Sequence, residues 1–345
     1  MESIIGKDIR VSIIMPVFNA VKYIDTALRS ILSQTYQKFE LIIIDDGATD
    51  GTSEICQKYA DENSCIRYVK QQNKGICVAR NRGLSMAMGE YITFSDHDDE
   101  YLPDYLKIMM EKVEKEHLDV VKCGVYFEET YANGNNITRI ETFKEEILSR
   151  KDLVRRYNFL PICYFGVWNS LYRAEIIRKN GICFSEDMHH GQEDFCFNTE
   201  LIPYINNIGF TSHCLYKHYR RISQSTSAQF YEDRIDSMST YFKKECKLLL
   251  PLFEKEERCK EYIFLYARKI TGILSYCFRT LQEHREDVCK RALNKFVVEN
   301  SFYYPFSFFN LLFSLYKTPK YAIILYLALN RYYKELFFLW QIKNK

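Results

Sequence analysis

The sequence lacks an excess of charge of either sign. Its 345 residues include 47 Lys or Arg and 45 Asp or Glu, which gives a formal net charge of +2. Binding to nucleic acid through a general basic surface is therefore not expected. Hydrophobic residues make up 47% of the chain and charged residues 27%, so a sizeable core can form, and disordered or collagen-like classes are excluded.

Long apolar runs and paired cysteines are missing as well. The longest apolar run, Tyr321 to Leu329, has nine residues, whereas a membrane-spanning helix needs about 20. The twelve cysteines form no C-x-x-C pair and no Cys/His spacing of a zinc site, and residues 1–10 show no secretory signal pattern. We therefore expect a cytoplasmic protein without a membrane-spanning helix or a disulfide framework.

The first 120 residues alternate between strand and helix patterns. Dense β-branched or apolar runs predict strands at residues 10–18, 39–44, 66–69 and 91–94. Helical spacing and capping residues predict helices at residues 20–34, 50–61 and 75–88. Apolar strands joined by helices indicate an α/β fold with a mostly parallel sheet covered on both faces. Ligands bind such sheets at the carboxyl ends of the strands.

The pattern changes after residue 118. Strand patterns at 119–128 and 137–143 flank an Asn-Gly-Asn turn, a helical pattern follows at 144–158, and residues 208–219 again resemble a strand. We interpret residues 1–118 and 119–230 as two halves of one α/β domain. Residues 231–345 are predicted to be a helical C-terminal region.

The segment from Phe94 to Asp99, FSDHDD, carries three carboxylates in four positions directly after an apolar strand. Such charges repel one another unless hydrogen bonds or a cation compensate, and Mg²⁺ or Mn²⁺ held by carboxylates and substrate phosphates is the usual solution. The alternative is a solvated acidic loop that caps the next helix. The position of this loop at a strand end, opposite Asp45 and Asp46, favours the metal.

Two further polar segments follow strand ends. In DDGATDGT (residues 45–52), one of the first two carboxylates can accept hydrogen bonds from a nucleoside, while the later residues are typical of a turn and a helix cap. In the segment that begins at Asn73, Gly75 at a helix start lets the backbone approach a ligand closely. Arg80, one turn further on, either faces a nucleotide or is an ordinary exposed helical arginine.

Taken together, five stretches resemble the family 2 glycosyltransferases, a group of nucleotide-sugar enzymes with the GT-A fold. They lie at residues 11–52 (VSIIMPVFN to IIIDDGATDGT), 73–84 (NKGICVARNRGL), 89–101 (GEYITFSDHDDEY), 168–173 (WNSLYR) and 191–198 (GQEDFCFN). The resemblance covers about residues 8–226, and its motifs occur in the family's order and spacing. It implies a GT-A α/β domain with a helical C-terminal extension.

The resemblance also implies roles for individual residues. On the nucleotide-sugar side it places Pro16, Val17, Phe18, Asn19, one of Asp45 and Asp46, Asn73, Gly75, Arg80 and Asp96, with one of His218, Arg220 and Arg221 at the diphosphate. Asp96 and Asp98 match the D-x-D signature, which holds the metal. Asp194 matches the general base of the E-D motif; the alternative is a first-turn acidic residue of an amphipathic helix. Glu193 and Trp168 are candidate acceptor contacts, and Trp168 alternatively belongs to the core.

These residue types suit a single displacement at an anomeric carbon. Negative charge builds on the departing diphosphate, which a divalent cation stabilises, and a carboxylate takes the proton of the attacking hydroxyl from the opposite face of the sugar. We therefore expect an inverting, metal-dependent transfer from a UDP-sugar to a glycan or lipid-linked oligosaccharide in cell-surface polysaccharide synthesis. The alternative is an inactive glycan-binding or scaffolding module on the same fold.

Residues 301–345 combine many aromatic side chains with six Lys or Arg and one acidic residue, Glu335. This composition is typical of helices that lie on an anionic bilayer. Peripheral membrane contact is therefore predicted for this segment. The alternative is a helical cap that buries its aromatic side chains on the catalytic domain or in a homodimer.

Overall fold

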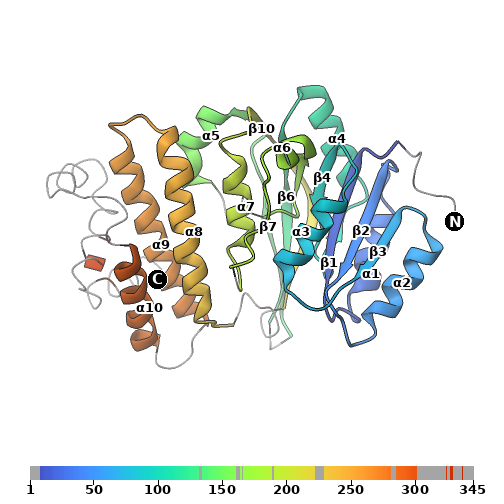
Figure 1. Cartoon of the computed structure of the whole chain (residues 1–345), viewed down its shortest axis with the longest axis horizontal. Coiled ribbons are helices and arrows are strands. Elements are labelled where there is room, and N and C mark those ends of the chain that lie inside the picture. The colour runs from blue at the N-terminus through green and yellow to red at the C-terminus, as the bar shows by residue number, and fades with distance from the viewer. Residues whose placement is uncertain are drawn as a thin grey trace. The chain divides into compact units, whose positions relative to one another are not determined.

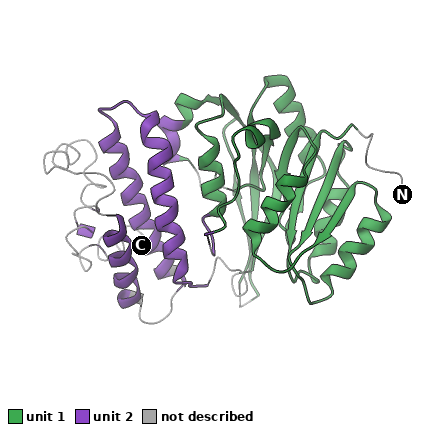
Figure 2. Cartoon of the chain, in the orientation of Figure 1, with its two compact units in different colours: residues 1–153, 160–186, 193–223 green, residues 154–159, 187–192, 224–345 purple. Residues whose placement is uncertain are grey.

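The computed structural model describes residues 8–131, 134–160, 164, 166–188, 190–221, 229–280 and 285–300, together with residues 324, 327, 328 and 336. The chain divides into two compact units (Figure 2). The first comprises residues 1–153, 160–186 and 193–223, and the second comprises residues 154–159, 187–192 and 224–345.

The first unit is built on one sheet (Figure 1). In sheet order its strands are β3 (Ile66–Lys70), β2 (Phe39–Asp45), β1 (Val11–Val17), β4 (Tyr91–Phe94), β9 (Ser170–Arg173), β6 (Val120–Thr130), β10 (Asn207–Arg221) and β5 (Glu100–Tyr101). Of the two strands off this path, β7 (Asn136–Glu141) pairs with β6, and β8 (Glu146–Ser149) pairs with β10. Strands β1 to β4 are parallel, as are β6 and β10, whereas β9 runs antiparallel to both β4 and β6.

The connections of this unit carry its helices. They are α1 (Ile24–Leu32), α2 (Thr52–Glu62), α3 (Ile76–Met86), α4 (Tyr105–Glu116), α5 (Arg150–Arg156), the short η1 (Tyr157–Phe159), α6 (Ala174–Lys179) and α7 (Glu193–Leu201). Helix α3 packs on β1 and β2 so closely that a Cβ at Gly83 would lie 2.3 Å from the Ile14 side chain. The predicted α/β sheet flanked by helices is thereby confirmed.

Strands β1 and β2 are buried along their whole length, which explains their continuous apolar sequences. Their polar residues have partners inside the sheet, because the Ser12 hydroxyl donates to the Glu40 carboxylate at 2.6 Å and Arg67 pairs with the same carboxylate at 3.0 Å. Strand β4 ends at Phe94, opposite Ile14 of β1. Pro16, which has no N–H to donate, therefore lies beyond the point where β4 pairs with β1.

One predicted helix is wrong in its first part and confirmed in the rest. Residues 144–158 were expected to be helical, but Glu146–Ser149 form strand β8, which pairs antiparallel with β10, and the helix begins only at Arg150. Leu148 is the buried residue of this short strand. With so little apolar patterning, pairing with a distant strand overrides the local sequence preference.

The second unit contains α8 (Asp233–Leu249), the short η4 (Leu250–Leu252), α9 (Arg258–Thr280) and α10 (Arg285–Asn300). Aromatic side chains from all three long helices meet in its core: Phe242 and Tyr266 lie 5.3 Å apart between ring centroids, and Tyr266 and Phe296 lie 5.4 Å apart. A helical C-terminal region is thus confirmed up to residue 300. The tail predictions for 301–345 fall almost entirely outside the described residues.

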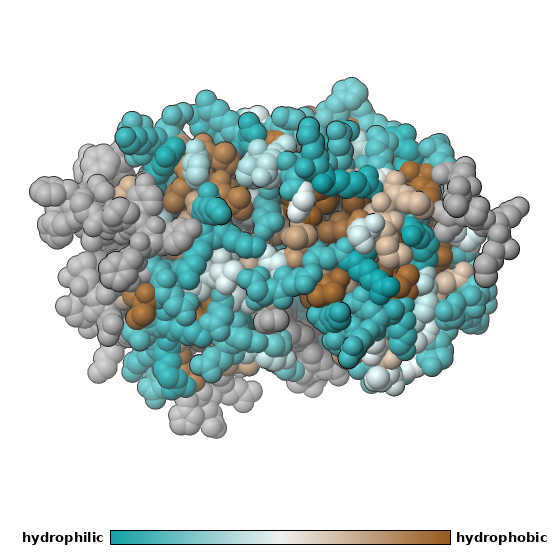
Figure 3. Space-filling model, viewed as in Figure 1, coloured by the Kyte–Doolittle hydropathy of each residue, from teal (hydrophilic) through white to brown (hydrophobic). Residues whose placement is uncertain are grey.

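Across the part of the chain that the structure describes, no helix combines the length and the apolar character needed to cross a bilayer. On the face drawn in Figure 3, hydrophilic side chains cover most of the surface, and hydrophobic ones form separate small patches.

Candidate functional site

The residues predicted to line the nucleoside follow the end of β1. Pro16 and Val17 are buried in the strand, whereas the Phe18 side chain is 42% exposed. Asn19 adopts a left-handed backbone with φ of 46°, and its side-chain oxygen accepts a hydrogen bond from the Thr49 N–H at 2.9 Å. Phe18 is therefore the residue of the four whose side chain can stack on a base.

Asp45 and Asp46 are both buried, with their hydrogen bonds made inside the protein. Asp45 accepts from the Ala48 N–H at 2.8 Å and from the Tyr68 hydroxyl at 2.6 Å. Asp46 accepts from the N–H groups of Lys74 at 2.9 Å and Gly75 at 2.8 Å. Of the two, Asp46 thus holds the turn between Asn73 and α3, next to the predicted nucleotide pocket.

Arg80 lies in α3 and is 1% exposed, so it is not an ordinary surface arginine. Its guanidinium donates to Asp96 at 3.0 Å and to Asp194 at 2.7 Å, and Glu193 lies 3.6 Å away. Residues more than 90 positions apart, from the acidic loop and from α7, therefore meet on one cation.

Asp194 stands in the first turn of α7 with a mostly buried side chain. Burial raises the pKa of Asp194 to about 7; Arg80 opposes this shift, and the Glu193 and Asp96 carboxylates add to it. A carboxylate with a pKa near neutrality can accept a proton and release it again at physiological pH. Asp194 is a first-turn acidic residue of α7, as the alternative describes, and in addition it pairs with the buried Arg80.

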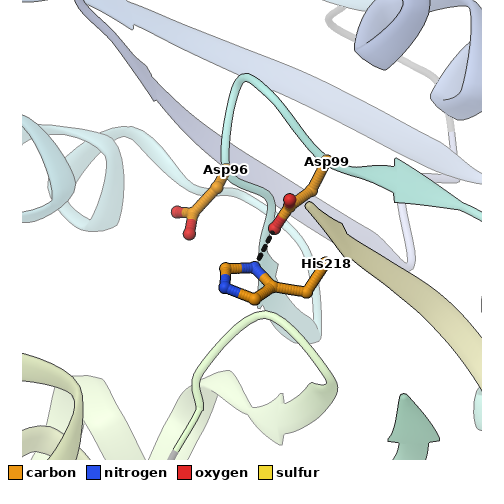
Figure 4. Close-up of side chains that lie close together, drawn as sticks. All are labelled: Asp96, Asp99 and His218. Carbon is orange, nitrogen blue, oxygen red and sulfur yellow. Dashed lines mark hydrogen bonds and ion pairs between the residues drawn. The ribbon is translucent and has the colours of Figure 1, made fainter. Parts of the chain in front are cut away.

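Asp99 is a buried centre of hydrogen bonds that sequence reasoning missed. Its carboxylate accepts from the Tyr216 hydroxyl at 2.8 Å, the Nδ1–H of His218 at 2.8 Å and the Tyr219 N–H at 2.9 Å. Figure 4 shows the pair Asp99 and His218 beside Asp96. The sequence did carry a signal for this cluster. Tyr216 and His218 are two residues apart in a strand, so their side chains lie on the same face of it.

Burial and charge set the protonation of this pair. Burial raises the pKa of Asp99 to about 6, and His218 opposes that shift. For His218, burial lowers the pKa, but the charge and the hydrogen bond of Asp99 outweigh it, so the net direction is upward. Because Nδ1 of His218 donates to Asp99, Nε2 remains available on the other side of the ring.

The donor set fits a divalent cation. One ligand atom each from Asp96, Asp99 and His218 lie within 4.8 Å of one another. Carboxylate oxygens and an imidazole nitrogen suit Mn²⁺, and carboxylates suit Mg²⁺. Asp99 is occupied by three donors, whereas the side chains of Asp96 and Asp98 are 23% and 31% exposed. The cluster thus contains Asp96 and His218, whereas Asp98, the other ligand predicted from the sequence, is not part of it and pairs with Arg221.

Arg221 and Trp168 border this cluster. Arg221 donates to Asp98 at 2.7 Å, and its guanidinium lies 3.7 Å from the centre of the Tyr23 ring. Trp168 is 7% exposed and stacks on His218, with ring centroids 5.0 Å apart and planes within 4°. Most of the Trp168 side chain is thus core, and its aromatic face supports the imidazole.

Sequence comparison identifies the family. The profile described as "Glycosyl transferase family 2" matches residues 12–181. An uncharacterized glycosyltransferase of Haemophilus influenzae is 30% identical over 236 residues, which cover 68% of this chain and 88% of that protein. The chain belongs to glycosyl transferase family 2. The uncharacterized glycosyltransferase YibD of Escherichia coli is 34% identical over 212 residues, or 61% of each chain, so the match spans about three fifths of that relative.

Solved structures support the GT-A fold of this family 2 member. Staphylococcus aureus TarS, residues 1–349 in complex with UDP-GlcNAc, aligns with a TM-score of 0.66 and 22% identity, covering 84% of this chain and 81% of that one. The mannosyltransferase PcManGT of Pyrobaculum calidifontis, in complex with GDP-Man and Mn²⁺, aligns with a TM-score of 0.52 and 16% identity, covering 97% and 86%.

Proposed function

We propose that this protein is an inverting glycosyltransferase that moves a sugar from a UDP-sugar to a hydroxyl of a glycan or lipid-linked oligosaccharide in cell-surface polysaccharide synthesis. The observation that carries the proposal is the double ion pair of Arg80 with Asp96 and Asp194. It holds a candidate cation ligand and a candidate base at the two terminal nitrogens of one guanidinium. A reacting sugar bound beside this arrangement meets both groups.

On the donor side, Phe18 stacks on the base, and the turn from Asn73 to Gly75, held by Asp46, borders the nucleotide. Asp96, Asp98 and His218 would hold the Mn²⁺ or Mg²⁺ ion. When bound, that ion stabilises the negative charge of the departing diphosphate. Arg221, paired with Asp98, adds positive charge at the same place.

On the acceptor side, Asp194 takes the proton of the attacking hydroxyl. Arg80 fixes the position of its carboxylate, and the raised pKa makes it a better proton acceptor than an ordinary aspartate. Glu193 and Trp168 are proposed to contact the acceptor. Because the acceptor hydroxyl, deprotonated by Asp194, attacks the anomeric carbon from the face opposite the diphosphate, the anomeric configuration inverts.

The most direct test of this proposal measures UDP release. Wild-type protein is incubated with UDP-GlcNAc, UDP-glucose and UDP-galactose in the presence of Mn²⁺, beside Asp194→Asn and the control Asp61→Asn, which changes an exposed carboxylate on α2. We expect turnover of one donor by wild type and control, and a loss of roughly 100-fold or more in Asp194→Asn. Equal turnover by Asp194→Asn contradicts the role of the base, and a retained anomeric configuration by NMR contradicts inversion.

A further inference from the structure

Three consecutive residues before α7 have left-handed backbone conformations. The φ angles are 55° at His190, 115° at Gly191 and 80° at Gln192. Glycine adopts this conformation freely, but the two flanking residues do so at an energetic cost. Such a run persists only where surrounding contacts hold it. The residues that follow at once are Glu193 and Asp194.

The first of these contacts holds His190. Its Nδ1–H donates to both oxygens of Asp233, at 2.9 Å each. The imidazole also stacks on Tyr231, with ring centroids 3.8 Å apart and planes within 3°. Asp233 is the first residue of α8. The side chain of His190 is therefore fixed in two directions by the start of this helix.

The second contact holds Gly191. A Cβ added there would lie 3.2 Å from Cζ of Arg234, so the guanidinium rests against the glycine backbone. The same guanidinium lies 4.6 Å from the centre of the Tyr276 ring in α9. The Tyr276 hydroxyl accepts from the Tyr231 N–H at 2.6 Å, which joins the two contacts. The support thus extends through two helices of the second unit.

We propose that this clamp, formed by Tyr231, Asp233 and Arg234 around His190 and Gly191, positions Asp194 for catalysis. Only Gln192 and Glu193 separate the clamped residues from Asp194, so the backbone direction at 190–192 sets where α7 begins. The three residues of the clamp, and the two residues that they hold, are positioning residues that act through Asp194 and do not touch the substrate. The proposal rests on the proposed function of Asp194 as the base.

The test compares Asp233→Asn with Asp236→Asn. Both change an acidic residue in the first turn of α8, but Asp236 pairs with Lys295 and not with His190. Hydrogen exchange of a peptide covering residues 190–199 is followed by mass spectrometry in the full-length protein. We expect exchange in this peptide to rise several-fold in Asp233→Asn and to stay unchanged in Asp236→Asn. Unchanged exchange in both variants overturns the clamp.

Kinetics supply the second readout. A small displacement of a catalytic group costs about 10- to 100-fold in rate, so kcat for UDP release should fall by that factor in Asp233→Asn while the donor KM stays within about twofold. His190→Ala should behave like Asp233→Asn. His190→Asn should retain more activity, because asparagine tolerates a left-handed backbone and can still donate to Asp233.

The two proposals fail in different ways. If the wild type releases no UDP, the proposed function fails, and the exchange measurement alone decides the clamp. If the wild type is active and Asp233→Asn matches Asp236→Asn in kcat, the clamp is structural at most and its role in positioning Asp194 is refuted.

Discussion

At the scale of single residues, Asp194 and Asp99 show how surroundings give two carboxylates different hydrogen-bond partners. Asp99 accepts three hydrogen bonds from residues of β10, which fix it in place. Asp194 has Arg80 as its cationic partner, and its side chain is 16% exposed, so part of it faces solvent. The first carboxylate can orient a neighbour, and the second can exchange a proton.

The raised pKa of Asp194 predicts how activity depends on pH. A base works in its deprotonated form, so kcat for UDP release should rise with pH through about 7 and level off above it. The measurement is a kcat profile between about pH 5 and 9 at saturating donor. A rate that is constant over this range, or that falls as pH rises toward 7, would contradict the assignment.

The pairing of Asp99 with His218 predicts an effect on metal affinity. Removing a carboxylate that orients a metal-binding histidine typically costs 10- to 100-fold, so Asp99→Asn should weaken Mn²⁺ binding by about that factor. The free Mn²⁺ signal in electron paramagnetic resonance, titrated in the presence of UDP, measures it. Asp104→Asn, which alters an exposed partner of Thr35, is the control. Equal Mn²⁺ affinity in Asp99→Asn and wild type would contradict the proposal that His218, oriented by Asp99, binds the ion.

Sequence reasoning reached some of these residues but not their contacts. Asp96, Asp98 and Asp194 stand in short motifs whose chemistry can be named from residue type and order. Arg80 was singled out, but its ion pair with Asp194 was not, because the two residues are 114 positions apart and only the fold brings them together. In the sequence Asp99 is one of three like charges, and only its burial in the fold sets it apart from Asp96 and Asp98.

At the scale of helices and strands, the predictions succeeded where burial is continuous. Strands β1 and β2 are buried on both faces, so their apolar runs mark them without ambiguity. Strand β8 has one buried residue among four, and its sequence alone predicts a helix. Its extended conformation is stabilised by antiparallel pairing with β10, which its own composition does not indicate.

A buried ion cluster joins α8 and α9 and gives a prediction for stability. Glu245 is completely buried and pairs with Lys269 at 2.9 Å, with Arg268 and with the Tyr157 hydroxyl at 2.8 Å. Breaking a buried pair from one side costs about 3–5 kcal/mol, because the other charge stays buried without compensation. Glu245→Ala should lower the free energy of unfolding in urea by that amount.

The matched control for this prediction is Glu62→Ala, which removes one partner of an exposed pair with Lys58 on α2. Exposed pairs contribute between about 0 and 1 kcal/mol, so the control should unfold almost like wild type. If both variants lost a similarly small amount of unfolding free energy, water would have access to Glu245, and the prediction of a buried ion cluster would be contradicted.

At the scale of the whole molecule, the basic and aromatic segment 301–345 leads to a prediction about membranes. We expect full-length protein to co-sediment with vesicles that contain anionic lipid, and binding to weaken as salt is added. Replacing Lys317 and Lys320 by Glu changes the local charge by four and should reduce binding severalfold. Binding that is equal for the variant and wild type would argue for a packing role of this segment.

The division into two units could not be predicted from composition. Residues 154–159 and 187–192 lie within the span that resembles the catalytic family, yet they belong to the same compact unit as the C-terminal helices. Their assignment depends on contacts such as Tyr157 with Glu245 and His190 with Asp233, which join positions 43 or more apart.

This interleaving limits how the protein can be recombined with its relatives. A chimera that exchanges only residues 224–345 would place foreign helices against the two short segments of this chain. It would also replace the side chains that contact His190 and Tyr157. A working crossover has to carry all three segments from the same parent. The C-terminal helices therefore cannot be exchanged on their own, even though most residues of their unit are contiguous in the chain.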